Sequence, residues 1–323
     1  MTADDRWMGA AVALGERGRG NTAPNPNVGC VIVKDDVVLG RGWTQAGGRP
    51  HAEAMALGEA GEAARGATVY VTLEPCCHRS ERGPACADRL VEAGVARVVA
   101  ALGDPDERVA GGGFERLKAA GVEVEIGPGA EQAARSMAGF LTRMRLGRPY
   151  VTLKLAMSLD GKIALPSGES RWITGEDARA HVHLERARSD MILVGRGTFE
   201  RDRPRLDVRL PGLEERSPRR ALLTRGEAVD GWTRLGSPDE LFALEDVNDL
   251  LVEGGSATAS AFLAADLVDR MLIYRAPILI GDGKSSVGYI GLTDLADAHR
   301  RWRLADSRML GIDRLEVYER ARS

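Results

Sequence analysis

Cysteine, histidine and aromatic residues are scarce in this sequence. The 323 residues include four cysteines and five histidines, and aromatic residues make up 5%. Four cysteines in a chain of this length do not make a disulfide scaffold. Three of the four fall between Cys76 and Cys86. This clustering favours a metal site.

The sequence also lacks long apolar runs and a strong net charge. No stretch of about 18 apolar residues occurs, so we expect no membrane span. The segment "MTADDRWMGAAVALG" predicts an amphipathic helix and lacks the features of a signal peptide, so we expect a cytoplasmic protein. The net charge of −3 provides no basic surface field, so we expect no nucleic-acid partner.

Length and composition indicate a globular protein with two domains. A chain of 323 residues is too long for one typical core. Hydrophobic residues make up 44% and charged residues 28%, which is ordinary for such a protein. A helical pattern ends at Gly147, and a strand pattern begins after Arg148-Pro149. We therefore expect domains at 1–147 and 148–323.

Both halves alternate strands with helices, which predicts α/β domains. In the first half we expect a strand pair around Lys34-Asp35-Asp36, helices from about Ala52 and Pro84, a partly parallel sheet and one final helix, "AEQAARSMAGFLTRMRLG". In the second half the expected strands are "YVTLKLAMSLDGKIA", "DMILVG", "RRALLT", "DLLVEGG" and "RMLIYRAPILIG". The helix "EDARAHVHLERARSD" is expected to be capped at Thr174.

A histidine and a glutamate two residues apart stand at an expected helix start. The stretch "GRPHAEAMAL" contains His51 and Glu53, and an isolated pair of this kind is commonly two surface residues. Further on, "LEPCCHRSERGPACADRL" supplies Cys76 and Cys86 before another helix. Imidazole and thiolate are the ligands that zinc prefers. We therefore predict zinc bound by His51, Cys76 and Cys86 between two helix N-termini.

Three protein ligands leave one zinc position for water, whose pKa the metal lowers to about 7. Glu53 would take a proton from that water and pass it to a leaving amine. H-x-E followed by P-C…C matches the signature of zinc-dependent base deaminases. Two alternatives remain open: Cys77 replaces Cys76, or all three cysteines and His51 close a structural site. Cys76 is favoured because it directly follows Glu74-Pro75.

Seven motifs occur in order along nearly the whole chain: "APNPNVGCVIV", "HAEAMAL", "VTLEPCCH", "GDPDERVAGGG", "LKLAMSLDGKIA", "SGESRWIT" and "LVEGG". Together they resemble the bifunctional deaminase–reductase family of riboflavin biosynthesis. The resemblance implies an N-terminal cytidine-deaminase-like α/β/α domain. It also implies a C-terminal α/β domain that is related in fold to dihydrofolate reductase.

The resemblance further implies substrates, cofactors and an assembly. The first domain, with one zinc ion, would remove the 2-amino group of 2,5-diamino-6-ribosylamino-4(3H)-pyrimidinone 5′-phosphate as ammonia. The second would use NADPH to reduce the ring-opened ribosyl group to a ribityl chain. The implied assembly is a homodimer or larger.

Individual residues acquire roles from the same resemblance. In the deaminase pocket these are Asn25, His78 and Asp104, with Arg82 near the place of a family lysine that meets the phosphate. In the reductase, Lys154 is the implied catalytic residue, Ala156, Trp172, Thr198 and Asp202 contact NADPH, and Ser170, Arg186, Leu206, Arg209 and Glu253 contact the phosphosugar. In "VEGGS", Gly254, Gly255 and Ser256 stand at a helix start whose amides would cradle the cofactor's phosphates.

The chain departs from the family pattern in three places. Nine residues separate Cys76 from Cys86, where the family usually has eight, and this loop holds Arg82. Thr44 replaces a family histidine. The segment between Asp207 and Leu250 is shorter by about one strand–helix unit, in a region where the family contacts the adenosine end of NADPH. The preference for NADPH over NADH is therefore open.

Some residues have simpler structural interpretations, and two other functions compete with this hypothesis. Cys30, alone in an apolar strand, is expected to be a core residue. His181 and His183 are two apart on one helix and are expected to pack or face solvent. The alternative enzyme is a deaminase of another base or nucleoside with an inactive second domain. The non-enzyme alternative is a binding protein with a closed structural zinc site.

Overall fold

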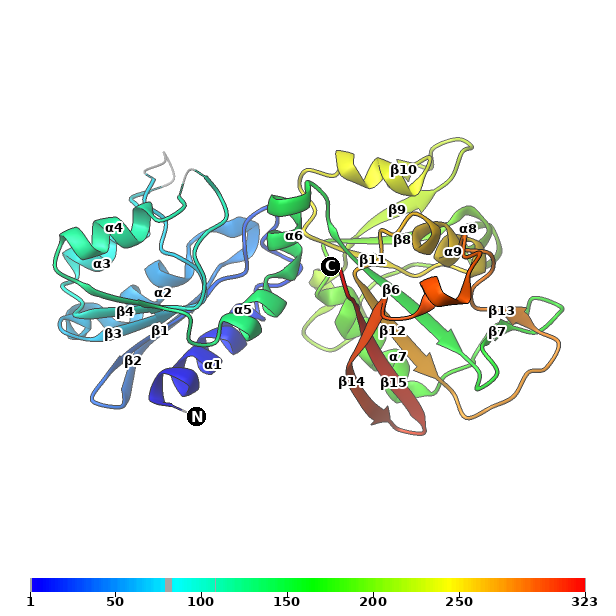
Figure 1. The fold of residues 1–323 in the computed structure, drawn as a ribbon, viewed down its shortest axis with the longest axis horizontal. Helices are drawn as coiled ribbons and strands as arrows, with labels where there is room; N and C mark the ends of the chain where they lie inside the picture. The colour runs from blue at the N-terminus through cyan, green and yellow to red at the C-terminus, as the bar shows by residue number, and fades with distance from the viewer. Residues whose placement is uncertain (1, 79–82, 108, 323) are drawn as a thin grey trace. The chain divides into compact units, whose positions relative to one another are not determined.

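The structure of this chain is a computed structural model that describes residues 2–78, 83–107 and 109–322. The chain divides into two compact units, Met1–Gly147 and Arg148–Ser323. In each unit, helices pack against a β-sheet (Figure 1). No helix in the described ranges has both the length and the apolar character needed to cross a membrane.

The first unit is built on a five-stranded sheet with the order β2-β1-β3-β4-β5. Its strands are β1 (Gly29–Lys34), β2 (Val37–Trp43), β3 (Thr68–Val71), β4 (Arg97–Ala100) and β5 (Glu123–Ile126). Strand β1 is antiparallel to β2 and β3, whereas the β3–β4 and β4–β5 pairs are parallel. The predicted partly parallel sheet is confirmed.

The helices of the first unit are α1 (Ala3–Gly15), α2 (Ala52–Ala60), α3 (Cys86–Glu92), α4 (Gly112–Ala119), α5 (Ala130–Ser136) and α6 (Ala138–Leu146), with short 3₁₀ helices η1 (Ala46–Gly48) and η2 (Gly61–Ala64). The β1–β2 hairpin turns at Asp35 and Asp36, with φ of 51° and 60°. Left-handed backbone at both central residues matches the twist of a two-residue hairpin. The predicted strand pair is therefore confirmed.

The single final helix expected in this unit is wrong, because the segment forms two helices that meet at Met137. The side-chain amide of Asn27 donates to the carbonyl oxygen of Ser136 at 3.3 Å. This contact occupies an acceptor that a continuous helix would offer to its own next turn. Met137 is 1% exposed in the core. A contact from a residue far away in the chain thus accompanies the break.

Glycines allow helices to lie unusually close to the first sheet. A Cβ at Gly29 would lie 1.8 Å from the carbonyl oxygen of Ala11 in α1. On β2, a Cβ at Gly40 or Gly42 would lie 2.1 Å from a carbonyl oxygen of α2. Any side chain at these positions would force the backbones apart. The glycines therefore set the distance between α2 and the sheet.

The second unit contains an eight-stranded sheet with the order β10-β9-β8-β11-β6-β12-β15-β14. Its strands are β6 (Tyr150–Met157), β8 (Met191–Gly195), β9 (Arg219–Leu223), β10 (Thr233–Leu235), β11 (Asp249–Val252), β12 (Arg270–Arg275), β14 (Trp302–Leu310) and β15 (Asp313–Arg320). All neighbours from β10 to β12 are parallel, and β15 and β14 add antiparallel strands. The predicted α/β class is confirmed here too.

The remaining elements of this unit are α7 (Glu176–Ala187), α8 (Arg196–Asp202), α9 (Ser256–Ala264), the small β7 (Lys162–Ala164) and β13 (Lys284–Ser285) pair, and 3₁₀ helices η3 (Glu214–Arg216), η4 (Pro238–Ala243) and η5 (Leu295–Ala298). The predicted cap at Thr174 is wrong, because Gly175 is the N-cap of α7. The amide of Gly175 donates to Asp313 Oδ2 at 2.6 Å. This tertiary contact accompanies a helix start one residue later than expected.

The strand order places three parallel strands, β8, β11 and β6, side by side. In the order β8-β11-β6-β12, the chain leaves β6 for β8 on one side of β6. After β11 it crosses to β12 on the other side of β6. In open parallel sheets such a reversal opens a crevice outside the carboxyl ends of the strands, where ligands bind. The fold therefore predicts a ligand-binding crevice formed by the residues that follow β6, β8 and β11.

Candidate active sites

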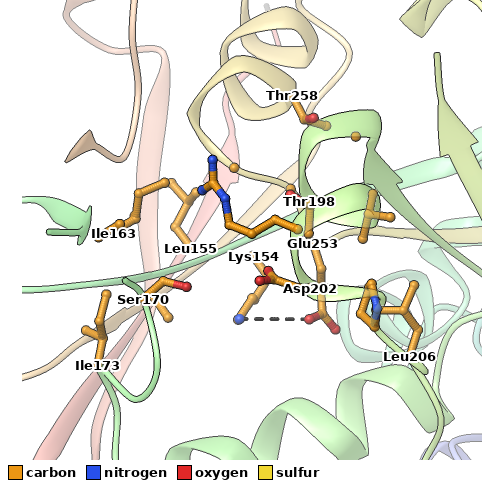
Figure 2. A pocket seen from close by; sticks show the side chains of 18 of the residues that line it. Lys154, Leu155, Ile163, Ser170, Ile173, Thr198, Asp202, Leu206, Glu253 and Thr258 are labelled. Atoms are coloured by element: carbon orange, nitrogen blue, oxygen red, sulfur yellow. Dashed lines mark ion pairs between the residues drawn. The ribbon is translucent and has the colours of Figure 1, made fainter. Parts of the chain in front are cut away.

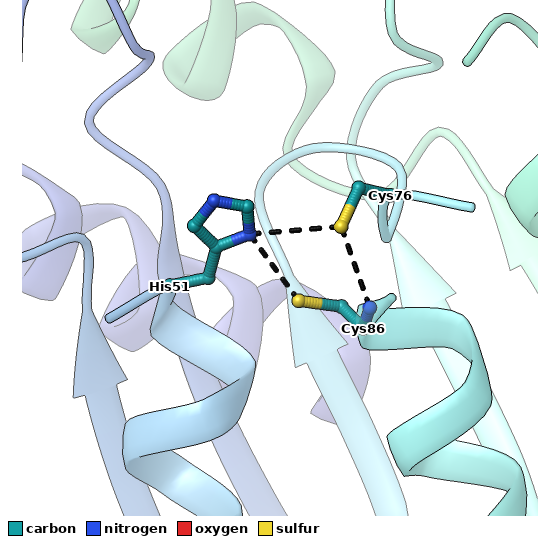
Figure 3. Close-up of side chains that lie close together, drawn as sticks. All are labelled: His51, Cys76 and Cys86. Carbon is teal, nitrogen blue, oxygen red and sulfur yellow. Dashed lines mark hydrogen bonds between the residues drawn. The ribbon is translucent and has the colours of Figure 1, made fainter. Parts of the chain in front are cut away.

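One imidazole and two thiols of the first unit come together at the starts of two helices (Figure 3). His51 is the N-cap of α2, Cys86 is the first residue of α3, and Cys76 lies in the loop after β3. His51 Nδ1 is 3.3 Å from Cys86 Sγ and 3.6 Å from Cys76 Sγ. All three donor atoms lie within 4.8 Å of one another. The structure thus brings the three predicted ligands together at two helix N-termini.

The chemistry of this donor set fits zinc, which prefers thiolate and imidazole ligands. The backbone amide of Cys86 donates to Cys76 Sγ at 3.3 Å. Hydrogen bonding from the Cys86 thiol, followed by that from His51, outweighs burial and lowers the pKa of Cys76 to about 4. Cys77 lies elsewhere, with its Sγ 3.8 Å from the carbonyl oxygen of Val109. Within the described ranges the cluster has three donors, which favours an open site over a closed one.

Glu53 lies in the first turn of α2, two residues after His51, and is 3% exposed. Burial raises the pKa of its carboxyl group, and the charge of Cys76 adds to this, whereas His51 opposes it. The Cys86 thiol hydrogen-bonds to the same carboxyl. A carboxyl group beside a candidate metal cluster, with its pKa raised above the usual value, suits proton transfer.

Glu74 organises the loop next to this cluster, and sequence reasoning missed it. Its buried carboxylate accepts hydrogen bonds from the amides of Gly113 and Phe114 at 2.9 and 3.3 Å, and from those of Asp104 and Gly111 at 3.2 and 3.0 Å. A negative charge at the start of α4 is also favoured by the helix dipole. Burial raises the pKa of Asp104 to about 6. The position of Glu74 immediately before Pro75 in "LEPCC" was the only signal in the sequence.

The second unit contains a cleft of about 740 Å³ in which the predicted reductase residues meet (Figure 2). It lies where the ends of β6, β8 and β11 meet the starts of α8 and α9. All thirteen residues predicted for the reductase site line it: Lys154, Ala156, Ser170, Trp172, Arg186, Thr198, Asp202, Leu206, Arg209, Glu253, Gly254, Gly255 and Ser256. The structure therefore gathers into one cleft residues that are spread over about a hundred positions.

A network of three charged side chains lies at the base of this cleft. Glu253 accepts from Arg186 Nε at 2.7 Å and from Arg186 Nη2 at 2.9 Å, and its Oε2 is 3.9 Å from Lys154 Nζ. Burial lowers the pKa of Lys154, although Glu253 opposes the shift. The two cations outweigh burial and lower the pKa of Glu253. The predicted phosphosugar ligand Arg186 thus holds Glu253 in place beside Lys154.

The start of α9 and an exposed tryptophan supply surfaces for a nucleotide. Gly255 is the N-cap of α9, and Gly254 precedes it on the cleft wall. Amides at a helix start bind phosphate oxygens, and glycines leave them accessible. Trp172 is 67% exposed although it lines the cleft, and the Arg179 guanidinium lies 4.7 Å from its ring centre. These residues fit a dinucleotide cofactor.

Family models match both units. Residues 1–102 match the cytidine and deoxycytidylate deaminase zinc-binding region, and residues 149–314 match the RibD C-terminal domain. The riboflavin biosynthesis protein RibD of Escherichia coli (strain K12) is 41% identical over 359 residues, covering 96% of this chain and 97% of the relative. That of Mycobacterium tuberculosis (strain ATCC 25618 / H37Rv) is 40% identical over 327 residues, covering 96% of both.

Solved structures agree over the full length. The chain superposes on Acinetobacter baumannii RibD (form 1) with a TM-score of 0.90 and 39% identity, covering 99% of both chains. It superposes on a diaminohydroxyphosphoribosylaminopyrimidine deaminase/5-amino-6-(5-phosphoribosylamino)uracil reductase from Thermotoga maritima with a TM-score of 0.89 and 31% identity, covering 98% of this chain and 99% of the other.

The chain belongs to the RibD family. It is a bifunctional deaminase and reductase of riboflavin biosynthesis, with a zinc-binding deaminase domain followed by a reductase domain. The resemblance inferred from the seven motifs is confirmed. The 327-residue alignment also indicates that the family includes a chain of about this length. Here the segment between β9 and β11 contains only β10 and η4 in regular structure.

The other residues carried over from the RibD family to the deaminase pocket differ in their placement. Asn25 packs against Gly48, where an added Cβ would lie 2.0 Å from Asn25 Nδ2. Gly48 lies three residues before the predicted metal ligand His51. His78 is exposed two residues after Cys76. Arg82 lies outside the described residues. Thr44, where the resemblance implied a histidine, is buried and its Oγ1 accepts a hydrogen bond from the Val28 amide at 3.0 Å.

Two histidines of α7, His181 and His183, differ in their surroundings. His181 Nδ1 lies 2.7 Å from the hydroxyl of the buried Tyr274, which confirms a packing contact. His183 Nδ1 lies 3.1 Å from the carbonyl oxygen of Asp207 and 3.3 Å from the amide nitrogen of Arg209, and this residue also lines the cleft. Sequence reasoning did not predict this position for His183. The two-residue spacing between His181 and His183 argued against a shared metal site, and it did not indicate that His183 lines a cleft.

Proposed function

We propose that the first domain deaminates 2,5-diamino-6-ribosylamino-4(3H)-pyrimidinone 5′-phosphate and that the second reduces the product with NADPH. The name of the Thermotoga maritima relative includes both a deaminase and a reductase activity. The observation that carries the proposal is the pairing of an open His–Cys–Cys cluster with the buried Glu53, on a chain whose second domain gathers the predicted reductase residues in one cleft.

In the first step, His51, Cys76 and Cys86 hold the metal, and Glu53 carries the proton. Zinc bound to these ligands supplies Lewis-acid activation of the attacking water. Glu53 accepts a proton from water as a carbon–oxygen bond forms at C2, and returns it to the amino nitrogen as the carbon–nitrogen bond breaks. Ammonia leaves, the proton of the new hydroxyl group passes to the ring nitrogen, and a ring carbonyl remains. The raised pKa of Glu53 suits both transfers.

Asn25, His78 and Asp104 orient the pyrimidine in this proposal, and Arg82 meets its phosphate. Asp104 is supported by its hydrogen bond to Glu74 and by a position close enough to Cys76 for that charge to raise its pKa. Asn25 is supported by its packing against the segment that leads to His51. Holding a ring in one orientation beside the attacking water contributes much of the rate in such reactions.

In the second step, Lys154 assists reduction of the opened sugar. NADPH supplies a hydride to C1′ of the ring-opened ribose. The Lys154 ammonium, held 3.9 Å from Glu253, donates a proton to the nitrogen that is double-bonded to C1′ in the ring-opened imine. The proposal assigns Ser170, Leu206 and Arg209 to the sugar, and Trp172, Thr198 and the glycines before α9 to the cofactor. All of these residues line the same cleft.

We further propose that the protein works in the cytoplasm as a homodimer or larger assembly. All four cysteines are free in the structure, which suits a reducing compartment. The edge strand β14 exposes Leu304 and Met309, at 53% and 60%, on the second domain. An exposed sheet edge with apolar side chains favours pairing with another chain. Light scattering after size exclusion measures the assembly, and a monomer at working concentration contradicts this part.

The test of both activities uses purified, zinc-loaded protein. Absorbance of NADPH reports reduction of 5-amino-6-(5-phosphoribosylamino)uracil, and a coupled assay reports ammonia release from the diamino precursor. Lys154→Ala is expected to lower reduction by about 10²-fold or more and leave ammonia release unchanged. Glu53→Gln is expected to do the reverse. Ammonia release without NADPH oxidation in the unmodified protein would leave a deaminase with an inactive second domain.

A further inference from the structure

Eight lysine and arginine side chains line the reductase cleft. Six of them have an acidic partner within 4.0 Å, and these are Lys154, Arg171, Arg179, Arg186, Arg196 and Arg209. The other two, Arg201 and Lys284, make no hydrogen bond or ion pair with any residue that the structure describes. Lys154 and Arg186 share one carboxylate, that of Glu253, whereas Arg201 and Lys284 have no carboxylate within 4.0 Å among the described residues.

Arg201 and Lys284 meet over a single glycine. Arg201 is in α8 and Lys284 is in β13, yet both approach Gly168 in the turn after β7. A Cβ built on Gly168 would lie 3.4 Å from Lys284 Nζ and 3.5 Å from Arg201 Nη1. Because both distances start from one point, the two nitrogen atoms are at most about 7 Å apart. Three segments that are distant in sequence thus form one cationic position.

The turn itself keeps the space between the two cations open. Gly168 has φ of +93°, a conformation that favours glycine, and it is buried although its chain neighbours are exposed. Its amide donates to the carbonyl oxygen of Leu165 at 2.9 Å, so it is already satisfied. The neighbouring carboxylate, Glu169, forms no ion pair with either cation within the described ranges. The position therefore offers two cationic side chains, neither of which is paired with a carboxylate among the described residues.

We propose that Arg201 and Lys284 form a binding site for a phosphate monoester at the rim of the reductase cleft. A phosphate monoester carries a charge of about −1.5 to −2 near pH 7, which matches two cations. The guanidinium supplies a fork of donors and the ammonium a point charge. Two donors that are no farther apart than about 7 Å can both reach oxygens of one phosphate group, since each hydrogen bond spans about 2.8 Å.

This inference rests on the proposed reductase function, whose two ligands each carry one phosphate monoester. One is the 2′-phosphate that distinguishes NADPH from NADH, and the other is the 5′-phosphate of the sugar substrate. Both would reach the same cleft. The chemistry at Arg201 and Lys284 is shared, so the experiment has to separate the two sources.

The test uses full-length, zinc-loaded Arg201→Gln, Lys284→Gln and the double variant. Matched controls are Arg205→Gln and Lys162→Gln, which remove the same charge from nearby positions that do not line the cleft. Calorimetry measures the Kd of NADPH, NADH, the phosphorylated ribosylaminouracil and its dephosphorylated form. Steady-state kinetics with the phosphorylated ligands measures KM and kcat.

Each single substitution is expected to weaken one phosphorylated ligand about tenfold, with kcat nearly unchanged and no effect on the form that lacks the phosphate. A loss confined to NADPH identifies the 2′-phosphate, and a loss confined to the sugar phosphate identifies the 5′-phosphate. Affinities within twofold of the unmodified protein, equal losses with and without the phosphate, or equal losses in the controls would overturn the site.

Failure of the proposed reductase function gives a different result. Unmodified protein that binds the phosphorylated ligands but does not oxidise NADPH would contradict the function, while a phosphate-dependent loss of binding in the variants would still support the site. Unmodified protein that binds neither phosphorylated ligand would overturn the site as well.

Discussion

At the scale of single residues, buried carboxylates organise both domains. Glu74 accepts four backbone amides, and Glu253 holds Arg186 and Lys154. A carboxylate can remain ionised when buried if several donors satisfy its oxygens. Asp190 differs, because a second carboxyl group, that of Asp249, lies near it at the starts of two neighbouring strands. Burial and this neighbour raise the pKa of Asp190 to about 7.

Asp190→Asn is expected to change how stability depends on pH. The folded protein keeps a proton on Asp190 at pH values where the unfolded chain, with an aspartate pKa near 3.8, has lost it. The contribution of Asp190 to the free energy of unfolding is therefore largest below about pH 4. It falls as the pH rises toward about 7 and is constant above that pH. The slope is at most about 1.4 kcal/mol per pH unit.

Urea unfolding from pH 4 to 8 measures this effect. The free energy of unfolding of the unmodified protein should fall relative to that of Asp190→Asn across this window. Parallel curves for the two proteins would show that Asp190 titrates normally.

At the scale of elements, the metal site depends on how closely α2 approaches β2. His51 and Glu53 stand at the start of this helix, and Gly42 faces it from the strand. The close approach lets α2 present its first turn beside Cys76 and Cys86. Catalytic groups have to be held within a fraction of an ångström, so helix position matters as much as residue identity.

Gly42→Ala is expected to displace the start of α2. The new Cβ would lie 2.1 Å from the carbonyl oxygen of Ala52 and 2.7 Å from Met55 Cβ. Overpacking of this kind costs about 1–3 kcal/mol. Zinc content per chain and ammonia release should fall, whereas NADPH oxidation with the deaminated substrate should remain.

Gly58→Ala is the matched control in the same helix, because a Cβ added at residue 58 would have no neighbour within 4 Å. This change should stabilise the protein by up to about 1 kcal/mol through helix propensity. Unchanged zinc content in Gly42→Ala would show that α2 can move without disturbing the ligands.

At the scale of the whole molecule, each unit has its own core and its own site. One core cluster spans residues of the first unit, including Met8 and Leu141, and three others lie within the second. The metal donors all belong to the first unit, and the cleft residues all belong to the second. The two chemistries therefore use separate sets of residues.

Removal of zinc is expected to separate the two activities. After incubation with a chelator, ammonia release should fall by at least about 10²-fold because the attacking water loses its activation. NADPH oxidation with the deaminated substrate should stay within about twofold, since no cleft residue belongs to the metal cluster. Ammonia release should return when zinc is added back. Equal loss of both activities would indicate that zinc also stabilises the second domain.

Much of the fold was readable from local patterns in the sequence. The turn at Asp35 and Asp36, the strand–helix alternation and the placement of His51 at a helix start depend on residues close together in the chain. The resemblance then supplied the distant partners that the cleft brings together. The β14–β15 hairpin was missed because β14 is largely exposed and lacks an apolar alternation.

Other features arose only from contacts between distant residues. Asn27 meets Ser136 where the expected final helix breaks, Asp313 binds the amide of Gly175 at the start of α7, and Glu74 gathers a loop some thirty to forty residues away. The sequence by itself thus determined most of the elements, the domain classes and the chemical groups. The tertiary structure alone decided where helices stop, how close α2 lies to its sheet, and which cations lack a partner, because distances between remote residues are set by packing.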